Sequence, residues 1–486
     1  MTNISKCEQL IRGGTVVDGS GSPRFVADIA IDGDRIVALG QLEDVSAEHT
    51  IDASGLIVAP GFIDAHTHDD RAVLSSPDMA AKTSQGVTSV VSGNCGISLA
   101  PLIGKEPPPP LNLLGQAAWF RFPTMDAYLS EVRSAPAALN IVPLVGHSTL
   151  RVGAMDRLDR PAEPAEIRVM QETLDAALKS GGIGLSTGLA YPTANAAPTE
   201  EVIALAKVAA AHGGVYATHM RDEREGVVES VRETIEIGAS AEVPVVISHH
   251  KATGKKNWGL TKDTLALIAE ARKRQRVDLD VYPYTASSTV LLEDFAAQSS
   301  KVLVTWSEPY PELAGRELSD IAKALGGGLS SVIARLQPAG AIYFQMDETD
   351  LQRVIQFEGA MIGSDGLPHD VHPHPRLWGT FARVLGHYSR GLGLLSLEEA
   401  VHRMSGKTAE VFGLADRGTL RVGAFADMVL FNAADVLDVA TFAEPTKRSA
   451  GIERVYVNGQ TVWADGRSTP ARPGRVLRRE PASGHA

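Results

Sequence analysis

Residues 61–68 read GFIDAHTH, an apolar run of β-strand length that ends in two histidines separated by one residue. Stretches with a helical pattern separate such runs along the middle of the chain, and this alternation is typical of parallel βα units. Seven further runs follow, at 88–96, 140–148, 183–192, 215–220, 244–251, 277–284 and 360–368. Eight units predict an α/β fold with a TIM-like (β/α)8 barrel, since an open doubly wound sheet usually has fewer strands.

The two ends of the chain differ from its middle. Residues 1–60 and 413–486 contain short runs of alternating apolar and polar residues bounded by Gly and Asp, as in antiparallel sheets. We expect both ends to share one small β domain beside a barrel at 61–412, and two separate β modules are the alternative. The interval of about 285–345 is too long for a βα connection and predicts an inserted lid. The tail after about Ser468, rich in Arg, Pro and Gly, is expected to be loose.

The composition limits the classes of partner. The chain of 486 residues has a net charge of -12, whereas a nucleic-acid binder would show a basic field. Its two cysteines, Cys7 and Cys95, cannot form a disulfide framework, which indicates a reducing compartment. The N-terminus lacks a signal-peptide pattern, and no apolar run approaches the roughly 20 residues of a membrane span. We predict a cytoplasmic protein that binds a small molecule and neither nucleic acid nor membrane, with the oligomeric state left open.

Polar residues gather where barrel enzymes carry their chemistry, at the carboxyl ends of the predicted strands. His66 and His68 alternate on one strand, so their side chains point the same way and can share a metal ion. A pair of hydrogen-bonded surface histidines is the alternative for this motif alone. The other polar residues at strand ends are Cys95, His147, His219, His249, His250, Tyr282 and Asp365.

Cys95 lies in the sequence GNCG after the second strand. Its thiolate suits Zn²⁺, and His219 and His249 supply the nitrogen ligands of a Cys-His-His set. An inert buried thiol and a nucleophilic cysteine paired with a histidine are the alternatives. The number of histidines at the other strand ends favours the metal site.

Asp365, in IGSDGLPHD, follows the last strand and is the predicted catalytic group. A carboxylate beside a metal-bound water can accept its proton and later give it to a leaving nitrogen. The alternative is an N-cap for the next helix. His147 and His250 are candidates either for orienting a metal ligand or for satisfied core positions.

Three residues are candidates for binding a carboxylate of the substrate. Lys251 directly follows two strand-end histidines, Tyr282 ends the seventh strand, and Arg376 lies just beyond the last strand, in HPHPRLWG. Fixed cations hold carboxylates, and Arg can do so through two parallel hydrogen bonds. A solvated surface charge is the alternative for a lone Lys or Arg.

Long motifs carry a resemblance to a known family. They read APGFIDAHTHDD, VVSGNCGISLAPL, GHSTLR, STGLAYP, YATHMRDE, VVISHHK, DVYPY, GAIYFQMDE and MIGSDGLPHD. From about residue 10 to about residue 475 the chain resembles the N-acyl-D-amino-acid deacylases, or D-aminoacylases, of the amidohydrolase superfamily. The resemblance implies a TIM-like barrel, a small β domain built from both chain ends, and a mobile lid inserted before the last strand.

The resemblance also implies which residues bind metal. Cys95, His219 and His249 match the ligands of one tight Zn²⁺. His66 and His68 match a second, weaker metal site whose need for activity is open.

The same resemblance implies the reaction and the residues that act on the substrate. Asp365 matches the catalytic acid and base, and Lys251, Tyr282, Ser288 and Arg376 match positions that serve the substrate. The expected reaction is zinc-dependent hydrolysis of an N-acyl-D-amino acid to a carboxylate and a free D-amino acid. Specificity for the D form comes only from the resemblance.

Other functions are weighed against this one. Hydantoinase-like cyclic amidohydrolases commonly bridge two metals with a carboxylated lysine, and no lysine stands at the matching strand ends. A non-enzymatic scaffold would lose metal ligands that this chain retains.

An N-acyl-D-glutamate or N-acyl-D-aspartate deacylase would need an extra cation for the second carboxylate of its substrate. The predicted lid segment 286–306 has no Arg and one lysine, Lys301, together with the acids Glu293 and Asp294. Apolar residues surround them, and buried apolar surface favours an apolar ligand. The sequence therefore predicts a preference for neutral apolar D-amino acids.

Overall fold

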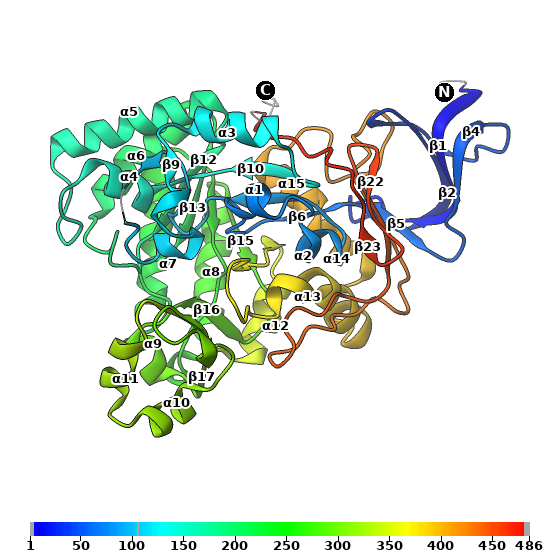
Figure 1. Cartoon of the computed structure of the whole chain (residues 1–486). Coiled ribbons are helices and arrows are strands. Elements are labelled where there is room, and N and C mark those ends of the chain that lie inside the picture. The colour runs from blue at the N-terminus through cyan, green and yellow to red at the C-terminus, as the bar shows by residue number, and fades with distance from the viewer. Residues whose placement is uncertain (1–3, 105, 481–486) are drawn as a thin grey trace.

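A parallel β-barrel forms the centre of the protein (Figure 1). The computed structural model describes residues 4–104 and 106–480. The eight strand positions are β6 (Phe62–Asp64), β7 (Val87–Ser92), β10 (Asn140–Pro143) continued by β11 (Val145–Gly146), β12 (Gly184–Gly188), β13 (Val215–His219), β14 (Val245–Ile247), β15 (Val277–Val281) and β19 (Ala360–Ile362). The first and last strands meet through a parallel bridge between Thr67 and Gly366. The predicted barrel is confirmed.

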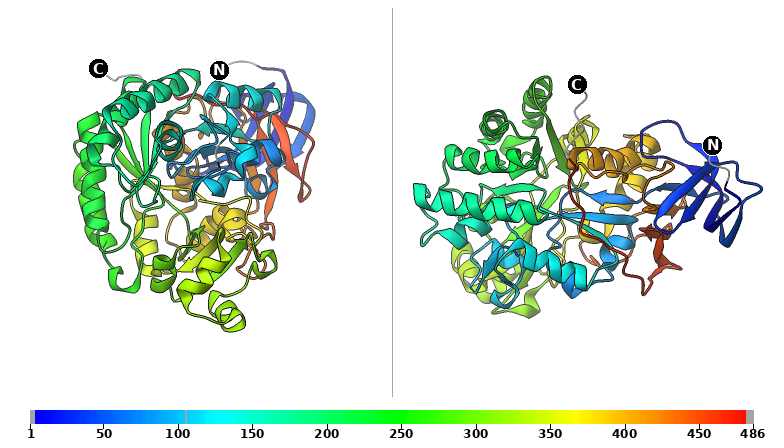
Figure 2. Two further views of the ribbon diagram at one scale, coloured as in Figure 1. Left: turned by 60° about the vertical axis from the view of Figure 1, so that its left-hand side comes forward. Right: turned by 90° about the horizontal axis from the view of Figure 1, so that it is seen from above.

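Helices cover the outside of the barrel (Figure 2). Each presents an apolar stripe to the strands; α7 (Val227–Ala241), for example, buries Val231, Ile237 and Ala241 at helical spacing. The other helices of this layer are α3 (Met125–Ser134), α4 (His147–Ala154), α5 (Pro164–Ser180), α6 (Thr199–Ala211), α8 (Thr261–Arg272), α12 (Glu348–Gln356), α13 (Arg376–Arg383), α14 (Leu397–Met404) and α15 (Gly406–Phe412). None of the helices in the described part of the chain is long and apolar enough to cross a bilayer.

Both ends of the chain build one small β domain, to the right in Figure 1. Its strands are β1 (Lys6–Val16), β2 (Phe25–Asp32), β3 (Arg35–Gly40), β4 (Ser46–Asp52), β5 (Ile57–Pro60), β20 (Met428–Phe431), β21 (Ile452–Val457), β22 (Gln460–Ala464) and β23 (Arg467–Ser468). Antiparallel pairing of β20 with β5 joins the two ends, and Val58, Met428 and Tyr456 pack in their shared core. The shared β domain is as predicted, and the limits at 60 and 412 stay a prediction.

An inserted subdomain lies between β15 and β19 and projects from the barrel, at the lower left of Figure 1. Its antiparallel sheet consists of β16 (Ala286–Val290), β17 (Lys301–Ser307) and β18 (Ala339–Phe344), with β18 in the middle. The helices α9 (Glu293–Gln298), α10 (Leu318–Leu325) and α11 (Leu329–Leu336) complete it. Val304, Ile321 and Leu336 belong to a separate apolar core, so the insertion packs as a unit of its own.

The expectation of a loose tail after Ser468 is wrong for the residues described, which extend to 480. Val476 forms a parallel bridge with Ile141, and Leu477 is buried in an apolar cluster at the barrel. The guanidinium group of Arg479 donates to two backbone carbonyl groups. Backbone pairing and one buried leucine hold a segment whose composition alone suggests disorder.

Candidate metal centre

The side chains predicted to carry the chemistry meet at the carboxyl-terminal mouth of the barrel. They come from the ends of five strands, namely β6 (His66, His68), β7 (Cys95), β13 (His219), β14 (His249) and β19 (Asp365). All except His66 line a cavity with a free volume of about 60 Å³, and His66 is completely buried beside it. A cavity of this size holds a few water molecules rather than a whole substrate.

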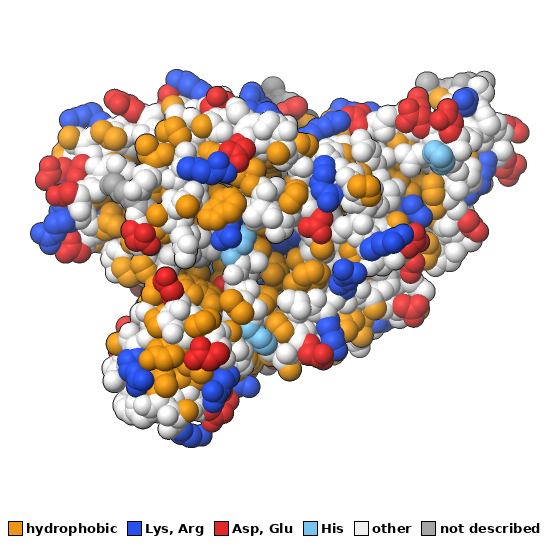
Figure 3. Space-filling model, viewed as in Figure 1, with side chains coloured by type: hydrophobic (Ala, Val, Ile, Leu, Met, Phe, Trp, Pro, Cys, Tyr) orange, Lys and Arg blue, Asp and Glu red, His pale blue; other side chains and the backbone are white. Residues whose placement is uncertain are grey.

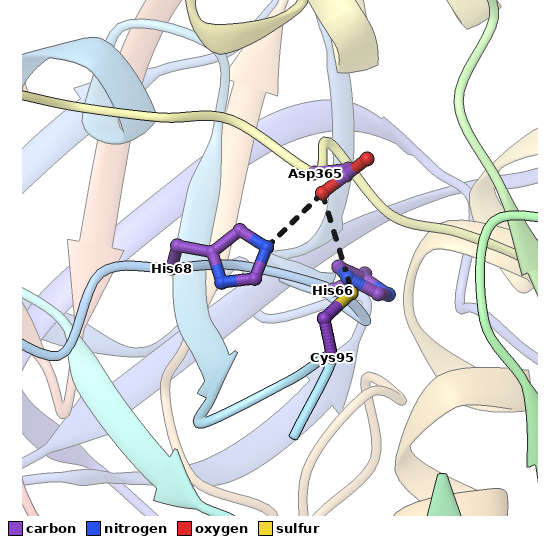
Figure 4. Close-up of side chains that lie close together, drawn as sticks. All are labelled: His66, His68, Cys95 and Asp365. Atoms are coloured by element: carbon purple, nitrogen blue, oxygen red, sulfur yellow. Dashed lines mark hydrogen bonds and ion pairs between the residues drawn. The ribbon is translucent and has the colours of Figure 1, made fainter. Parts of the chain in front are cut away.

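Cys95 belongs to two groups of metal-ligand atoms. The first group contains His66, His68, Cys95 and Asp365, and their side chains converge in Figure 4. The second group contains Cys95, His219 and His249. Within each group the ligand atoms lie within 4.8 Å of one another. The thiolate is therefore placed to be shared by two adjacent metal positions.

The donor atoms of the second group fit one zinc ion. Sγ of Cys95 lies 3.4 Å from Nε2 of His249, which lies 3.1 Å from Nδ1 of His219. Ligands that bind one Zn²⁺ at about 2.0–2.3 Å in tetrahedral geometry lie roughly 3.3–3.7 Å from one another. The atoms are near that arrangement, and one thiolate with two imidazoles is a donor set that suits Zn²⁺.

The backbone is strained at three of these positions. Cys95, His249 and Asp365 have φ values of 52°, 37° and 49°, in the left-handed region that side chains other than glycine rarely adopt. Such conformations persist where the surrounding fold imposes them, and they cluster at functional sites. Gly96 shows why glycine follows the thiol, because a Cβ there would come within 2.7 Å of the backbone nitrogen of Gly188.

Charge complementarity favours the ionised forms of the central thiol and carboxyl groups. Burial alone would raise the pKa of Cys95, but His66 and His249 outweigh it and hold that pKa well below its usual value. Burial likewise opposes ionisation of Asp365, but the guanidinium of Arg376 and the imidazoles of His66 and His68 together outweigh it, so the pKa of Asp365 is well below its usual value. A thiolate and a carboxylate are the forms that bind metal or accept a proton.

Two carboxylates that the sequence analysis missed support the ligand histidines. Oδ2 of Asp280 lies 3.3 Å from Nδ1 of His66, and Oε1 of Glu223 lies 3.0 Å from Nδ1 of His249. A carboxylate that accepts the second ring N–H fixes the orientation of a histidine ligand and makes it more basic. The available signals were an acid four residues after His219 and an acid near the end of the seventh strand.

The predicted substrate residues also reach the cavity. Lys251, Tyr282 and Ser288 line it, and the ammonium of Lys251 lies 2.7 Å from Glu223. Arg376 is completely buried behind the wall, where Nη1 lies 2.9 Å from Oδ2 of Asp365 and Nη2 donates to the backbone carbonyl of Ser288. Arg376 thus contacts the predicted catalytic group rather than the open space.

His147 and His250 are buried but bond outside the metal centre. Nε2 of His147 lies 3.0 Å from Glu201. Nε2 of His250 lies 2.8 Å from the hydroxyl of Thr264 on α8. These partners favour core positions over a role in orienting metal ligands, although Nδ1 of each ring has no hydrogen-bond partner among the described residues.

The model of the amidohydrolase family matches residues 49–301 and 333–463. D-aminoacylase from Alcaligenes xylosoxydans xylosoxydans is 54% identical over 473 residues, which cover 97% of this chain and 98% of that protein. From the same organism, N-acyl-D-aspartate deacylase is 48% identical (97% of this chain, 95% of that protein) and N-acyl-D-glutamate deacylase is 47% identical (98% and 97%).

Solved structures agree with these relatives. A crystal structure of D-aminoacylase has a TM-score of 0.96 at 55% identity, covering 97% of this chain and 100% of the other. N-acyl-D-glutamate deacylase from Bordetella bronchiseptica, complexed with zinc and a phosphonate mimic of the tetrahedral intermediate, has a TM-score of 0.93 at 45% identity, with the same coverage. This chain therefore belongs to the amidohydrolase family, among the N-acyl-D-amino-acid deacylases.

Proposed function

We propose that this protein hydrolyses the amide bond of N-acyl-D-amino acids and releases a carboxylate and a free D-amino acid. The observation that carries the proposal is the pair of buried ligand groups that share Cys95 and include Asp365, in a chain 54% identical to a D-aminoacylase. The related deacylase complexed with zinc and a phosphonate supports amide hydrolysis at such a site.

The residues that would hold zinc follow from the two ligand groups. Cys95, His219 and His249 would bind the tight ion, and His66 and His68 would hold a second ion that shares the thiolate. A bound Zn²⁺ supplies Lewis acidity, which lowers the pKa of water and polarises the substrate carbonyl. One relative is described as having a binuclear centre with one-metal activation and second-metal attenuation, so the group of Cys95, His219 and His249 is the one we propose to be essential.

Asp365 is the proposed general base and acid. Its Oδ1 lies 3.2 Å from Nε2 of His68, and its Oδ2 lies 2.9 Å from Arg376. These contacts fix the carboxylate at the edge of the cavity in its ionised form, ready to take a proton from the attacking water. When the C–N bond breaks, Asp365 returns that proton to the leaving nitrogen.

Lys251, Tyr282 and Ser288 are proposed to bind the carboxylate of the substrate. All three line the cavity, and the ammonium of Lys251 lies 5.7 Å from the ring centre of Tyr282. An ammonium has three N–H donors, of which Lys251 uses one for Glu223 and one for the backbone carbonyl of His249, so one is left to donate to a substrate carboxylate. Because the cavity has room for only a few water molecules, we propose that the inserted subdomain moves to admit substrate.

The side chain of the amino acid is proposed to lie against the inserted subdomain. Of the apolar residues in segment 286–306, Phe295 lines the cavity, whereas Leu291 and Leu303 are buried in apolar clusters of the subdomain. Lys301 is exposed and lies over the ring of Phe344. This arrangement supports the proposed preference for neutral apolar side chains.

Arg224 is the observation that favours the second candidate, a deacylase for acidic D-amino acids. It lines the same cavity, and its guanidinium carbon lies 5.2 Å from the ring centre of Phe295. Its carboxylate neighbour, Asp222, is 3.8 Å away, a distance that leaves donors free for a second carboxylate. Relatives specific for D-aspartate and D-glutamate are 48% and 47% identical to this chain.

Amine release from matched substrates tests the proposal. Hydrolysis of N-acetyl-D-leucine without hydrolysis of N-acetyl-L-leucine is expected, and the reverse order would refute it. Comparing kcat/KM for N-acetyl-D-leucine and N-acetyl-D-glutamate in the wild type and in Arg224→Met then separates the two candidates. A glutamate preference that disappears in Arg224→Met would establish the acidic specificity.

The proposals about cellular location and binding partners are based mainly on the sequence. A cytoplasmic protein without nucleic-acid or membrane partners is proposed from the net charge of -12 and from two free, buried cysteines, Cys7 and Cys95.

A further inference from the structure

A second cavity, with a volume of about 810 Å³, lies beside the metal centre on the same face of the barrel. Arg71 comes from the loop after β6, Trp119 from the loop after β7, and His369 and Asp370 from the loop after β19. Trp306 of the inserted subdomain forms the opposite wall. Figure 3 shows this face hollowed between the barrel and the subdomain, with hydrophobic side chains along the hollow.

The two cavities are neighbours that share a wall. Leu113 lines both of them. Pro110 and Leu367 line the catalytic cavity, and the chain segments that carry them continue directly into the wall of the second cavity at 107–109 and 369–371. The larger cavity therefore adjoins the catalytic cavity of about 60 Å³ at Leu113.

Unpaired polar atoms mark the second cavity as a place for a polar ligand. Four buried side-chain atoms in its wall have no hydrogen-bond partner within the part of the chain that the structure describes. They are Nε of Arg71, Oδ1 of Asn112, Nε2 of His369 and Oδ2 of Asp370. The set contains donors and acceptors, which is the requirement of an amide group with its N–H and C=O. Buried polar atoms normally have a hydrogen-bond partner, so these four atoms are candidates to bond to a ligand.

Aromatic surface lies beside these atoms. The guanidinium carbon of Arg71 lies 4.6 Å from the ring centre of Trp119. Glycine at position 115 leaves room for this pair, because a Cβ there would come within 2.9 Å of the Trp119 ring and 3.1 Å of Arg71. Trp119 and Trp306 offer flat apolar faces on which a ligand ring can stack.

We propose that this second cavity is a subsite for the acyl group of the substrate, and that it takes acyl groups that carry an aromatic ring and a further amide. This inference rests on the proposed deacylation. The acyl carbon must lie at the metal centre, so the remainder of a long acyl group would run past Leu113, with its amide beside Arg71 and Asp370 and its ring against Trp119. A short N-blocked peptide that ends in a D-amino acid has this chemistry.

Benzoylglycyl-D-leucine tests the subsite, with N-acetyl-D-leucine as the short substrate. In both, water adds to the carbonyl carbon next to the D-leucine nitrogen and the C–N bond breaks, which gives free D-leucine together with benzoylglycine or acetate. In Trp119→Ala and Arg71→Met, kcat/KM for the benzoylglycyl substrate is expected to fall about tenfold. The value for N-acetyl-D-leucine should stay unchanged, which also reports correct folding.

Arg448→Met is the matched control, because Arg448 also lies over a tryptophan, 5.5 Å from the ring centre of Trp463, but in the β domain. In Arg448→Met, kcat/KM should stay unchanged for both substrates. Equal losses for both substrates, or full benzoylglycyl activity in both variants, would overturn the subsite. Hydrolysis of the acetyl substrate without hydrolysis of the benzoylglycyl substrate by the wild type would also overturn it and leave the proposed function intact. Absence of both activities would instead refute deacylation.

Discussion

The buried ammonium group of Lys82 lies 2.7 Å from the carboxylate of Asp64, at the seam between the first and the last strand of the barrel. It also donates to the hydroxyl of Ser364 over 2.6 Å, and Asp64 accepts a hydrogen bond from the backbone N–H of Ser364. These contacts tie the segment that carries His66 and His68, two proposed metal ligands, to the segment that carries Asp365. We therefore propose Lys82 as a positioning residue for Asp365, the proposed catalytic carboxylate.

Lys82→Met should lower kcat strongly and destabilise the fold. Removing one partner of a buried ion pair typically costs about 3–5 kcal/mol, because Asp64 would be left as an unpaired buried charge. Lys407→Met is the control, since Lys407 pairs with Asp278 over 2.9 Å at the other end of the barrel. Thermal unfolding and kcat of both variants check this. A folded Lys82→Met with normal kcat, or an equal loss of kcat in Lys407→Met, would contradict the positioning role.

Ser364→Ala gives a milder test of the same contact. It removes the hydrogen bonds that the Ser364 hydroxyl accepts from Lys82 and from the backbone N–H of Gly366, and it leaves the ion pair of Lys82 with Asp64 in place. A loss of kcat with unchanged KM is expected if the seam positions Asp365.

Cys95→Ala should lose tightly bound zinc. The thiolate is the only sulfur ligand in either group, and two imidazoles do not make a tight site for Zn²⁺. Metal analysis of the purified protein after dialysis measures the effect, with Cys7→Ala as the matched control because Cys7 is also a free buried thiol. Stoichiometric zinc in Cys95→Ala would exclude Cys95 as a ligand.

Asp365→Asn should keep zinc and lose most of kcat. An amide cannot accept and return a proton, and general acid–base groups typically contribute roughly 10²–10⁴-fold. The measurement is kcat together with zinc content. If only KM rises, Asp365 binds substrate and another group transfers the proton.

Asp370 should make the folded state less stable as pH rises. Burial raises the pKa of its carboxyl from 3.8 to about 7, so the folded protein holds this proton more tightly than the unfolded chain does. The stabilisation is complete at low pH and is lost as pH rises through about 7.

Asp370→Asn keeps a neutral side chain at every pH. Its Tm should therefore be close to that of the wild type at pH 4 and higher at pH 8, which calorimetry at both pH values measures. A Tm difference that does not change with pH would show that the Asp370 carboxyl is not the group that titrates.

Local sequence patterns were sufficient to predict the barrel and the types of side chain that gather at its mouth. Strand-length apolar runs with polar residues at their ends predicted the strands, and spacing by two on one strand placed His66 and His68 together. The common mouth of a parallel barrel then brought Cys95, His219 and Asp365 to one place, because every strand end faces the same side.

The tertiary structure decided what supports and extends that centre. Glu223 and Asp280 stand behind histidines that lie 26 and 214 residues away in the chain, and Lys82 bonds to a serine 282 residues away. No local period encodes such contacts, because they depend on how loops from different strands pack. The strained backbone at Cys95 has the same origin.

The second cavity and the C-terminal tail also depend on long-range packing that the sequence alone does not reveal. Arg71, Trp119 and Asp370 line one cavity only because the fold places three barrel loops and the inserted subdomain side by side. Leu477 is one apolar residue in a polar tail, and only its position under the barrel shows that it is buried. The sequence by itself determined the elements and the chemistry at their ends, since both depend on near neighbours, whereas long-range packing determined the neighbours, orientation and charge state of those groups.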